Sequence, residues 1–332
     1  MAMATTEISF YHNLAQSALE QYDLSQKDCH FLGHSGNVTF RIEAQTGKFL
    51  LRIHQAISDA QSEIWQRADL IESELIWLDE LHQKTKIAVQ KPVKTRQDQW
   101  VTQVSVNQTV VNCSILEWIE GELLDSEPTS EQAYQLGFLM AQLHQHSQQW
   151  QPPQNFIRPS YDRTRLQAAL SNLQSAIAQE LISIEHFVRL GNAVAQIESR
   201  IPALLAQTPE TWGLIHADLH SGNYLLHNEE FRPIDFALCG FGYYLYDVAS
   251  ALQYLSPTTR SNFFEGYQSL QNLPEHYLPI TESFFIMAVL DVMAFHVSNP
   301  LEHEWLAETV KDVADHHIAS YLEGKSFLFD RY

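Results

Sequence analysis

The chain has 332 residues, of which 45% are hydrophobic and 18% charged, and its formal net charge at pH 7 is −20. This length suits two modest domains or one large domain, and the hydrophobic content is enough for a sizeable core. The acidic charge argues against a nucleic-acid partner, which needs a basic face, and against adhesion to an anionic membrane. It is compatible with attraction of a cationic substrate, but the simpler interpretation is that it only keeps the protein soluble.

The sequence favours an intracellular protein. Its few cysteines are odd in number and widely spaced, which favours a reduced compartment over a disulfide framework: Cys29, Cys113 and Cys239. Residues 1–20 lack the basic and apolar regions of a signal peptide. The most apolar stretch, 283–295, is too short to span a bilayer and contains Asp291, so it predicts a buried helix. We therefore expect a cytoplasmic protein.

The first third of the chain predicts an antiparallel sheet with one long helix inserted. Residues 7–22 have an amphipathic helical pattern. Two alternating apolar runs then meet at Gln45-Thr46-Gly47, which predicts a β-hairpin. Apolar residues at helical spacing predict a helix over 60–82. Two more strands are expected around a polar turn at Asn107-Gln108.

After Gly121 the pattern becomes mainly helical. Helices are predicted over 130–147, through most of 162–207, and from Leu245 to Leu328, with breaks near Pro257, Pro274, Pro279 and Pro300. Short strands are expected at 224–226 and 231–235. The sequence therefore predicts an α+β fold, with a small antiparallel β lobe over 1–120 and a large mainly helical lobe over 121–332.

The segment GLIHADLHSGNYLLHNEEFRPIDF, residues 213–236, carries the most chemistry. Asp218 and Asn223 lie five residues apart in a polar loop, and a hairpin can return Asp235 to the neighbourhood of Asn223. Two carboxylates and an amide oxygen are ligands that suit Mg²⁺. One carboxylate is then left to orient or deprotonate a hydroxyl, which is the division of labour that phosphoryl transfer needs.

Two other interpretations of this segment stay open. His216, Asp218 and His220 stand at alternate positions and could bind the metal of a hydrolase, although the following Ser-Gly-Asn is typical of a turn. Alternatively, His216 caps the loop and the aspartates only accept hydrogen bonds from backbone amides.

The motif HADLHSGN, followed by IDF, resembles the catalytic and metal motifs of the aminoglycoside phosphotransferase and choline kinase-like family of small-molecule kinases. The resemblance covers most of the chain. GHSGNVTFRIEA, FLLRIH, ESELIWLDEL, ILEWIEGE, LGFLMAQLHQHS and GYYLYDVASAL are similar, in order and spacing, to further segments of that family. The resemblance implies a two-lobed protein-kinase-like fold. Ala237 stands where protein kinases carry glycine, which weakens a protein-kinase interpretation.

The resemblance also implies roles in the helical lobe. Asp218 would be the catalytic base, and Asn223 and Asp235 would hold Mg²⁺. His216 would tie the loop to the core. Asp247 would brace the loop, although an acid near a helix start is also favoured by the helix dipole.

The resemblance assigns the nucleotide site to the β lobe. Arg52 would bind phosphate and Glu74 would pair with it, although periodicity alone does not choose between Glu74 and Glu72. Backbone groups of Ser35 and Gly36 would cover the phosphates. Backbone groups of Glu117 and Ile119 would hold the base of ATP, with GTP also possible.

The sequence thus predicts a kinase that transfers the γ-phosphoryl group of Mg·ATP to a hydroxyl of a small metabolite or aminoglycoside-like acceptor. Acidic residues such as Asp291 and Glu265 are compatible with a cationic acceptor, or with a solvated helix face. The main alternative is an ATP-binding pseudokinase without turnover. The sequence does not fix the oligomeric state.

Overall fold

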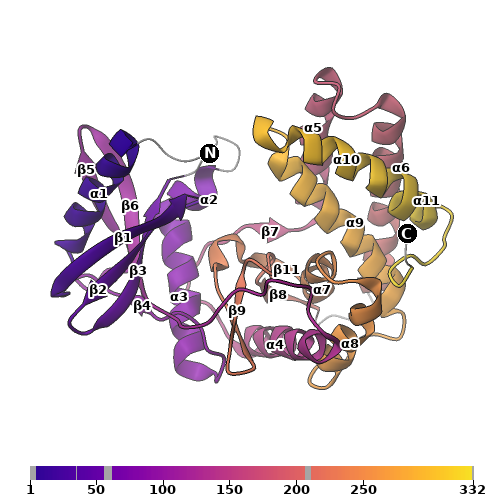
Figure 1. The fold of residues 1–332 in the computed structure, drawn as a ribbon. Coiled ribbons are helices and arrows are strands. Elements are labelled where there is room, and N and C mark those ends of the chain that lie inside the picture. The colour runs from indigo at the N-terminus through magenta and orange to yellow at the C-terminus, as the bar shows by residue number, and fades with distance from the viewer. Residues whose placement is uncertain (1–4, 35, 56–61, 206–210, 331–332) are drawn as a thin grey trace. The chain divides into compact units, whose positions relative to one another are not determined.

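A computed structural model describes residues 5–34, 36–55, 62–205 and 211–330 (Figure 1). The chain divides into two compact units. Unit 1 contains the residues up to Gly121 together with two later segments, Pro152–Arg158 and Arg232–Ala237. Unit 2 contains Glu122–Gln151, Pro159–Phe231 and Leu238–Tyr332.

Unit 1 is built on the predicted antiparallel sheet. Its strand order is β1-β2-β3-β6-β4, and β5 also pairs with β6. The bounds are β1 (Gln26–His34), β2 (Val38–Ala44), β3 (Gly47–His54), β4 (Pro92–Val93), β5 (Thr102–Val106) and β6 (Thr109–Glu117). Both predicted hairpins are confirmed, β2 with β3 and β5 with β6.

Local backbone geometry explains the second hairpin. Asn107 and Gln108 have φ angles of 51° and 69°. Two consecutive positive φ angles are typical of the tight turns that match the twist of the flanking strands. The strands it joins bury Val104, Val111 and Cys113 in a core that also contains Leu14 and Ala18 of α1 (Thr5–Leu19).

The helix expected over 60–82 consists of two helices, α2 (Ser62–Gln66) and α3 (Ala68–Lys84). They are separated by Arg67, which has extended backbone angles of φ −78° and ψ 119°. The apolar stripe continues through both helices, which is why periodicity alone did not reveal the break. Glu74 lies on the buried face of α3, beside Ile71 and Leu78.

Unit 2 is mainly helical, as expected. Its helices of nine or more residues are α4 (Ser130–Gln149), α5 (Arg163–Ala178), α6 (Ile184–Leu205), α7 (Tyr244–Leu252), α8 (Pro257–Gln268), α9 (Tyr277–His296) and α10 (His303–Asp312). The expected strands of segment 213–236 are β9 (Tyr224–His227) and β10 (Glu230–Pro233). After α10 come a π-helical turn (Val313–Ile318) and α11 (Ala319–Leu322).

Helix α9 forms the centre of unit 2 and contacts α5, α6, α7 and α10 (Figure 1). It is long and apolar enough to cross a membrane, but 72% of its apolar window is buried inside the protein. This supports the predicted buried helix. Pro279 does not break the helix, because it lies in the first turn, where a missing N–H breaks no helical hydrogen bond.

Helices α4 and α8 approach each other closely at two glycines. A Cβ atom added at Gly137 would lie 1.9 Å from the carbonyl oxygen of Phe263, and one at Gly266 would lie 1.8 Å from that of Tyr134. No side chain fits at either position. Helix α4 begins with a capping box between Thr129 and Gln132. This packing fixes the position of α4, which carries His144, a residue that supports the candidate active site.

A small three-stranded sheet was not expected from the sequence. Its order is β7-β11-β8, with β7 (Ser160–Tyr161), β8 (Trp212–Ile215) and β11 (Gly240–Tyr243). The strands have two to four residues and lie far apart in the chain, so no periodic pattern identifies them. Strand β8 leads directly into His216 and Asp218.

Candidate active site

The loop after β8 brings Asp218 and Asn223 into direct contact. The Asn223 amide nitrogen donates to the Asp218 Oδ2 atom over 2.7 Å and to its backbone carbonyl over 2.9 Å. Since both bonds use the amide nitrogen, the carbonyl oxygen of Asn223 is the atom that it can present to a cation. The side chain is 7% exposed.

Asp247 on α7 holds the start of this loop. Its carboxylate accepts hydrogen bonds from the backbone amides of His216 over 3.0 Å and Ala217 over 2.7 Å. It also contacts the His144 Nε2 atom at 2.9 Å. Asp247, His144 and His216 are fully buried. A buried charge is tolerated when its hydrogen bonds are made, so this network is a rigid support for the loop.

Opposing effects act on the pKa of Asp247. Burial alone would raise this pKa, but the hydrogen bond and charge of His144, the charge of His216 and the amide of Ala217 together lower it. Ala217 has a φ of 68°, a strained conformation for a residue with a side chain. The strain is held by Asp247 and by Ser250, whose hydroxyl donates to the Ala217 carbonyl over 3.3 Å.

In unit 1, Arg52 of β3 pairs with Glu74 of α3 at a distance of 2.7 Å between Nη1 and Oε1. The structure therefore chooses Glu74 over Glu72 as the partner. The two residues are 4% and 2% exposed. Within the described ranges, the Nε and Nη2 atoms of Arg52 have no hydrogen-bond partner. Buried donors of this kind cost free energy unless a ligand takes them.

Asp235 belongs to unit 1 and lies within the electrostatic reach of Arg52 and Glu74. Its side chain is open to solvent, yet the surrounding protein desolvates the carboxylate and raises its pKa; Arg52 lowers this pKa and Glu74 raises it. The φ of Asp235 is 55°. The next residue, Phe236, packs edge-on against Trp77 of α3, with 5.3 Å between ring centroids, and so anchors this backbone.

The other predicted nucleotide residues also lie in unit 1, except that Ser35 is outside the described residues. Gly36 has a φ of 119° and lies against Trp65. The Glu117 amide donates to the Lys91 carbonyl over 2.7 Å, and its side chain pairs with that lysine. Ile119 is half-buried two residues later.

The metal trio of the hydrolase alternative does not form. In the part of the chain that the structure describes, the only group of three residues with converging metal-binding atoms is Asp28, His30 and Glu43, far from this loop in sequence. The His216 Nδ1 atom accepts from the Asp218 amide, and the His220 Nδ1 atom accepts from the Gly222 amide.

Sequence reasoning missed two supporting residues. His144 lies on the buried face of α4 and joins Asp247 to the Tyr267 hydroxyl, which is 2.8 Å from its Nδ1 atom. Arg158 is buried in unit 1 and donates to the carbonyls of Leu70 and Ala237 over 2.9 and 2.5 Å. The signal in the sequence for His144 was a histidine inside an apolar helix face. The sequence contains no comparable signal for Arg158.

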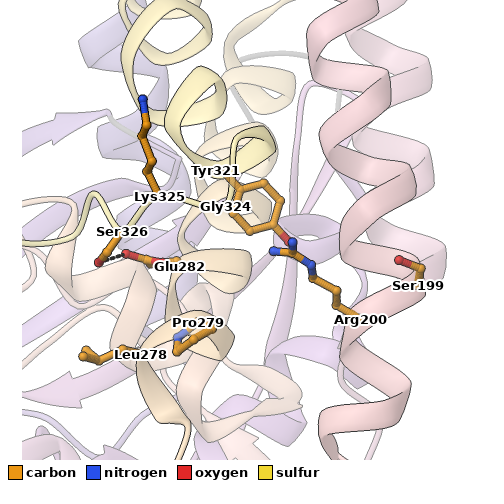
Figure 2. Close-up of a pocket in the computed structure, with 9 residues that line it drawn as sticks. All are labelled: Ser199, Arg200, Leu278, Pro279, Glu282, Tyr321, Gly324, Lys325 and Ser326. Carbon is orange, nitrogen blue, oxygen red and sulfur yellow. Dashed lines mark hydrogen bonds between the residues drawn. The ribbon is translucent and has the colours of Figure 1, made fainter.

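A pocket of about 700 Å³ in unit 2 is lined by Ser199, Arg200, Leu278, Pro279, Glu282, Tyr321, Gly324, Lys325 and Ser326 (Figure 2). None of these belongs to the predicted site. The Arg200 guanidinium lies 5.2 Å from the centre of the Tyr321 ring, and Glu282 accepts from Ser326 over 2.6 Å.

The fold and the two groups of residues place the protein among enzymes with a protein-kinase-like fold. A family model makes the assignment specific: the phosphotransferase enzyme family (APH) matches residues 30–279, and the chain belongs to it. The predicted resemblance and the expectation of a phosphotransferase are confirmed.

Three relatives illustrate this membership. A microcompartment-associated aminopropanol kinase is 25% identical, with 96% of this chain and 99% of that chain covered and a TM-score of 0.77. The amicoumacin kinase hAmiN, solved with AMP-PNP, Ca²⁺ and Ami, shares the fold at 19% identity, with 94% and 96% covered and a TM-score of 0.73. The uncharacterized protein sll1119 of Synechocystis sp. is 25% identical over 271 residues, 79% of this chain and 71% of that protein.

Proposed function

We propose that the protein is a small-molecule kinase that transfers the γ-phosphoryl group of Mg·ATP to a hydroxyl group. The observation that carries this proposal is the guanidinium of Arg52. It is buried, it is held in place by Glu74, and its Nε and Nη2 atoms have no partner among the described residues. An anionic phosphate is the ligand that best satisfies such a group, because arginine can bind it through two nitrogens.

Asp218 is the base in this proposal. The acceptor oxygen attacks the γ-phosphorus while its proton passes to the Asp218 carboxylate. The bond from the γ-phosphorus to the β–γ bridging oxygen breaks, and its electron pair leaves with ADP. The hydrogen bond from Asn223 to Oδ2 and the brace from Asp247 support this role, because they hold the carboxylate in one orientation before the acceptor binds.

We propose Asn223 and Asp235 as the ligands of Mg²⁺. Mg²⁺ prefers oxygen atoms and keeps several waters, so it needs few protein ligands. Asn223 offers a carbonyl oxygen because Asp218 occupies its nitrogen, and Asp235 offers a carboxylate beside a phosphate-binding arginine. When bound, Mg²⁺ would neutralise charge on the nucleotide phosphates.

We assign the phosphates to the loop at Ser35 and Gly36, and the base to backbone groups of Glu117 and Ile119. The nucleotide seen in the amicoumacin kinase supports a nucleotide as the donor. Because backbone groups would bind the base, the side chains do not distinguish adenine from guanine, and both ATP and GTP are candidate donors. The acceptor we propose to test first is a small amino alcohol, as the similarity to the aminopropanol kinase suggests.

The experiment is an assay of ADP release with a panel of hydroxyl acceptors, coupled to mass spectrometry of the phosphorylated product. We expect acceptor-dependent ADP release by the parent protein and none by Asp218→Asn. A parent protein that binds ATP but phosphorylates no acceptor would favour the pseudokinase alternative. Equal rates in Asp218→Asn and the parent would contradict the assignment of the base.

A further inference from the structure

Two aromatic side chains stand beside Asp218 in unit 2. The His220 Nε2 atom lies 3.7 Å from the Asp218 Oδ2 atom, too far for a hydrogen bond but in close contact. The imidazole lies against the ring of Tyr254, with 5.0 Å between the ring centroids and 35° between the planes. These two residues, which we name the aromatic wall, do not take part in the phosphoryl transfer described above.

The loop is built to hold His220 in one neutral orientation. The Gly222 amide donates to the Nδ1 atom over 3.0 Å, so this nitrogen carries a lone pair and the proton sits on Nε2. Burial lowers the pKa of His220, which also favours the neutral ring. A Cβ atom at Gly222 would lie 2.8 Å from the imidazole, so a side chain there would displace it. The wall therefore adds no positive charge beside Asp218.

Tyr254 is positioned by the same helix that braces the loop. It follows the end of α7, and its amide donates to the Ala251 carbonyl over 3.1 Å. Tyr254 is 39% exposed. Burial and the nearby charge of Asp218 raise the pKa of the Tyr254 hydroxyl to about 12. The phenol therefore stays neutral and presents an aromatic surface near a carboxylate.

Asp291, one of the acids that seemed available to a cationic acceptor, is already paired with an arginine. Arg165 of α5 binds both carboxylate oxygens of Asp291 at distances of 2.7 to 2.9 Å, and its guanidinium lies 4.2 Å from the centre of the Tyr161 ring. Asp291 is thus a structural residue that joins α5 to α9. Asp291 is therefore not available to bind the ammonium group of an acceptor.

We propose that Tyr254, backed by His220, is a specificity-determining residue of the acceptor site and receives the ammonium group of a small amino alcohol. An ammonium group is attracted to the face of a tyrosine ring, and the charge of Asp218 adds to this attraction. The acceptor must place its hydroxyl at Asp218 and its ammonium on a ring only one imidazole away. Such a span favours a compact acceptor over a large sugar. This inference rests on the proposed function.

The test compares a charged acceptor with a neutral one of the same size, 1-amino-2-propanol and 1,2-propanediol, in the parent, Tyr254→Phe and Tyr254→Leu. Loss of the aromatic ring in Tyr254→Leu should raise KM for the amino alcohol about tenfold. It should leave KM for the diol and for ATP nearly unchanged. Tyr254→Phe keeps the ring and should behave like the parent. A purely structural role would change both acceptors alike.

The outcomes separate the inference from the proposed function. A parent protein that turns over the diol better than the amino alcohol would overturn the inference alone. So would Tyr254→Leu with an unchanged ratio between the two acceptors, or with both values of KM raised equally. A parent protein that phosphorylates no hydroxyl acceptor would overturn the proposed function, and the inference with it. Unfolding temperatures of the three proteins show whether each variant is folded.

Discussion

The buried polar groups around Asp247 and those around Arg52 are arranged in opposite ways. Asp247 accepts from two backbone amides and contacts His144, which in turn contacts the Tyr267 hydroxyl. Arg52 uses one nitrogen for Glu74 and leaves two others without a partner in the described chain. The first arrangement is complete without a ligand, and the second is not. We infer that the groups around Asp247 support the loop and that the groups around Arg52 bind a ligand.

The proposed catalytic base should show the largest effect. Asp218→Asn keeps the size of the side chain but removes the group that accepts the proton, so we expect kcat to fall by about 10²- to 10⁴-fold. Binding of Mg·ATP, measured by titration calorimetry, should stay close to that of the parent. A variant that also loses nucleotide binding would mean that Asp218 acts in binding rather than in catalysis.

Asp247→Asn should show the largest effect on stability. The Asp247 carboxylate meets His144 Nε2 and the backbone amides of His216 and Ala217 through two oxygen atoms. Asparagine has only one oxygen that can accept these bonds, and its NH₂ group would face another hydrogen-bond donor. Breaking such a buried network typically costs about 3–5 kcal/mol of the free energy of unfolding, which urea titration would measure. The control is Tyr267→Phe, which removes only the outermost hydroxyl and should cost about 1 kcal/mol.

The same carboxylate predicts a pH dependence. The folded-state pKa of Asp247 is lowered, so its contribution to stability is fully present above the unfolded pKa of about 4 and is lost as pH falls through the folded value. The stability difference between the parent and Asp247→Asn should therefore shrink at acidic pH. A difference that is constant from neutral pH down to about pH 3 would contradict the lowered pKa.

In the Arg52 region we expect loss of binding with little loss of rate once the site is saturated. Arg52→Gln removes the charge that we propose contacts phosphate, so it should weaken ATP binding about 10- to 100-fold, the range for hydrogen bonds to charged groups. Because this variant leaves the Glu74 carboxylate buried without its partner, the double variant Arg52→Gln, Glu74→Gln is the matched control for stability. ATP binding of parental strength in the folded double variant would rule out a phosphate contact at Arg52.

The smallest effect is expected in the pocket of Figure 2. Arg200 lines this pocket and forms no ion pair among the residues that the structure describes, so Arg200→Ala should change stability by less than about 0.5 kcal/mol. We expect kcat/KM for ATP and for the hydroxyl acceptor to stay within about twofold of the values of the parent. A larger loss of activity would show that this pocket, and not only the loop of Asp218, takes part in the reaction.

Local patterns predicted most elements and the contact between Asp218 and Asn223. Both hairpins follow from alternation and turn residues, and the pairing of Asp218 with Asn223 depends on only five residues of chain. The choice between Glu72 and Glu74 could not be made, because both flank the same apolar stripe. It depends on packing of α3, which buries Glu74 and leaves Glu72 half-buried.

Long-range contacts were beyond the sequence. His144 and Asp247 are 103 positions apart, and Arg165 and Asp291 are 126 positions apart. No periodicity connects such residues, because side-chain periodicity reports only the faces of one helix or strand. For the same reason Asp291 looked like a candidate for binding a cationic acceptor until the structure showed Arg165 bound to it.

The most direct test of the account is calorimetric titration of the parent and Asp235→Ala with ATP, with and without Mg²⁺. We expect ATP to bind the parent more tightly when Mg²⁺ is present. In Asp235→Ala this magnesium-dependent part should be lost, while the contribution of Arg52 remains. Absence of binding of ATP and GTP to the folded parent, with or without Mg²⁺, would contradict the proposed kinase function and leave the family membership as a statement about fold.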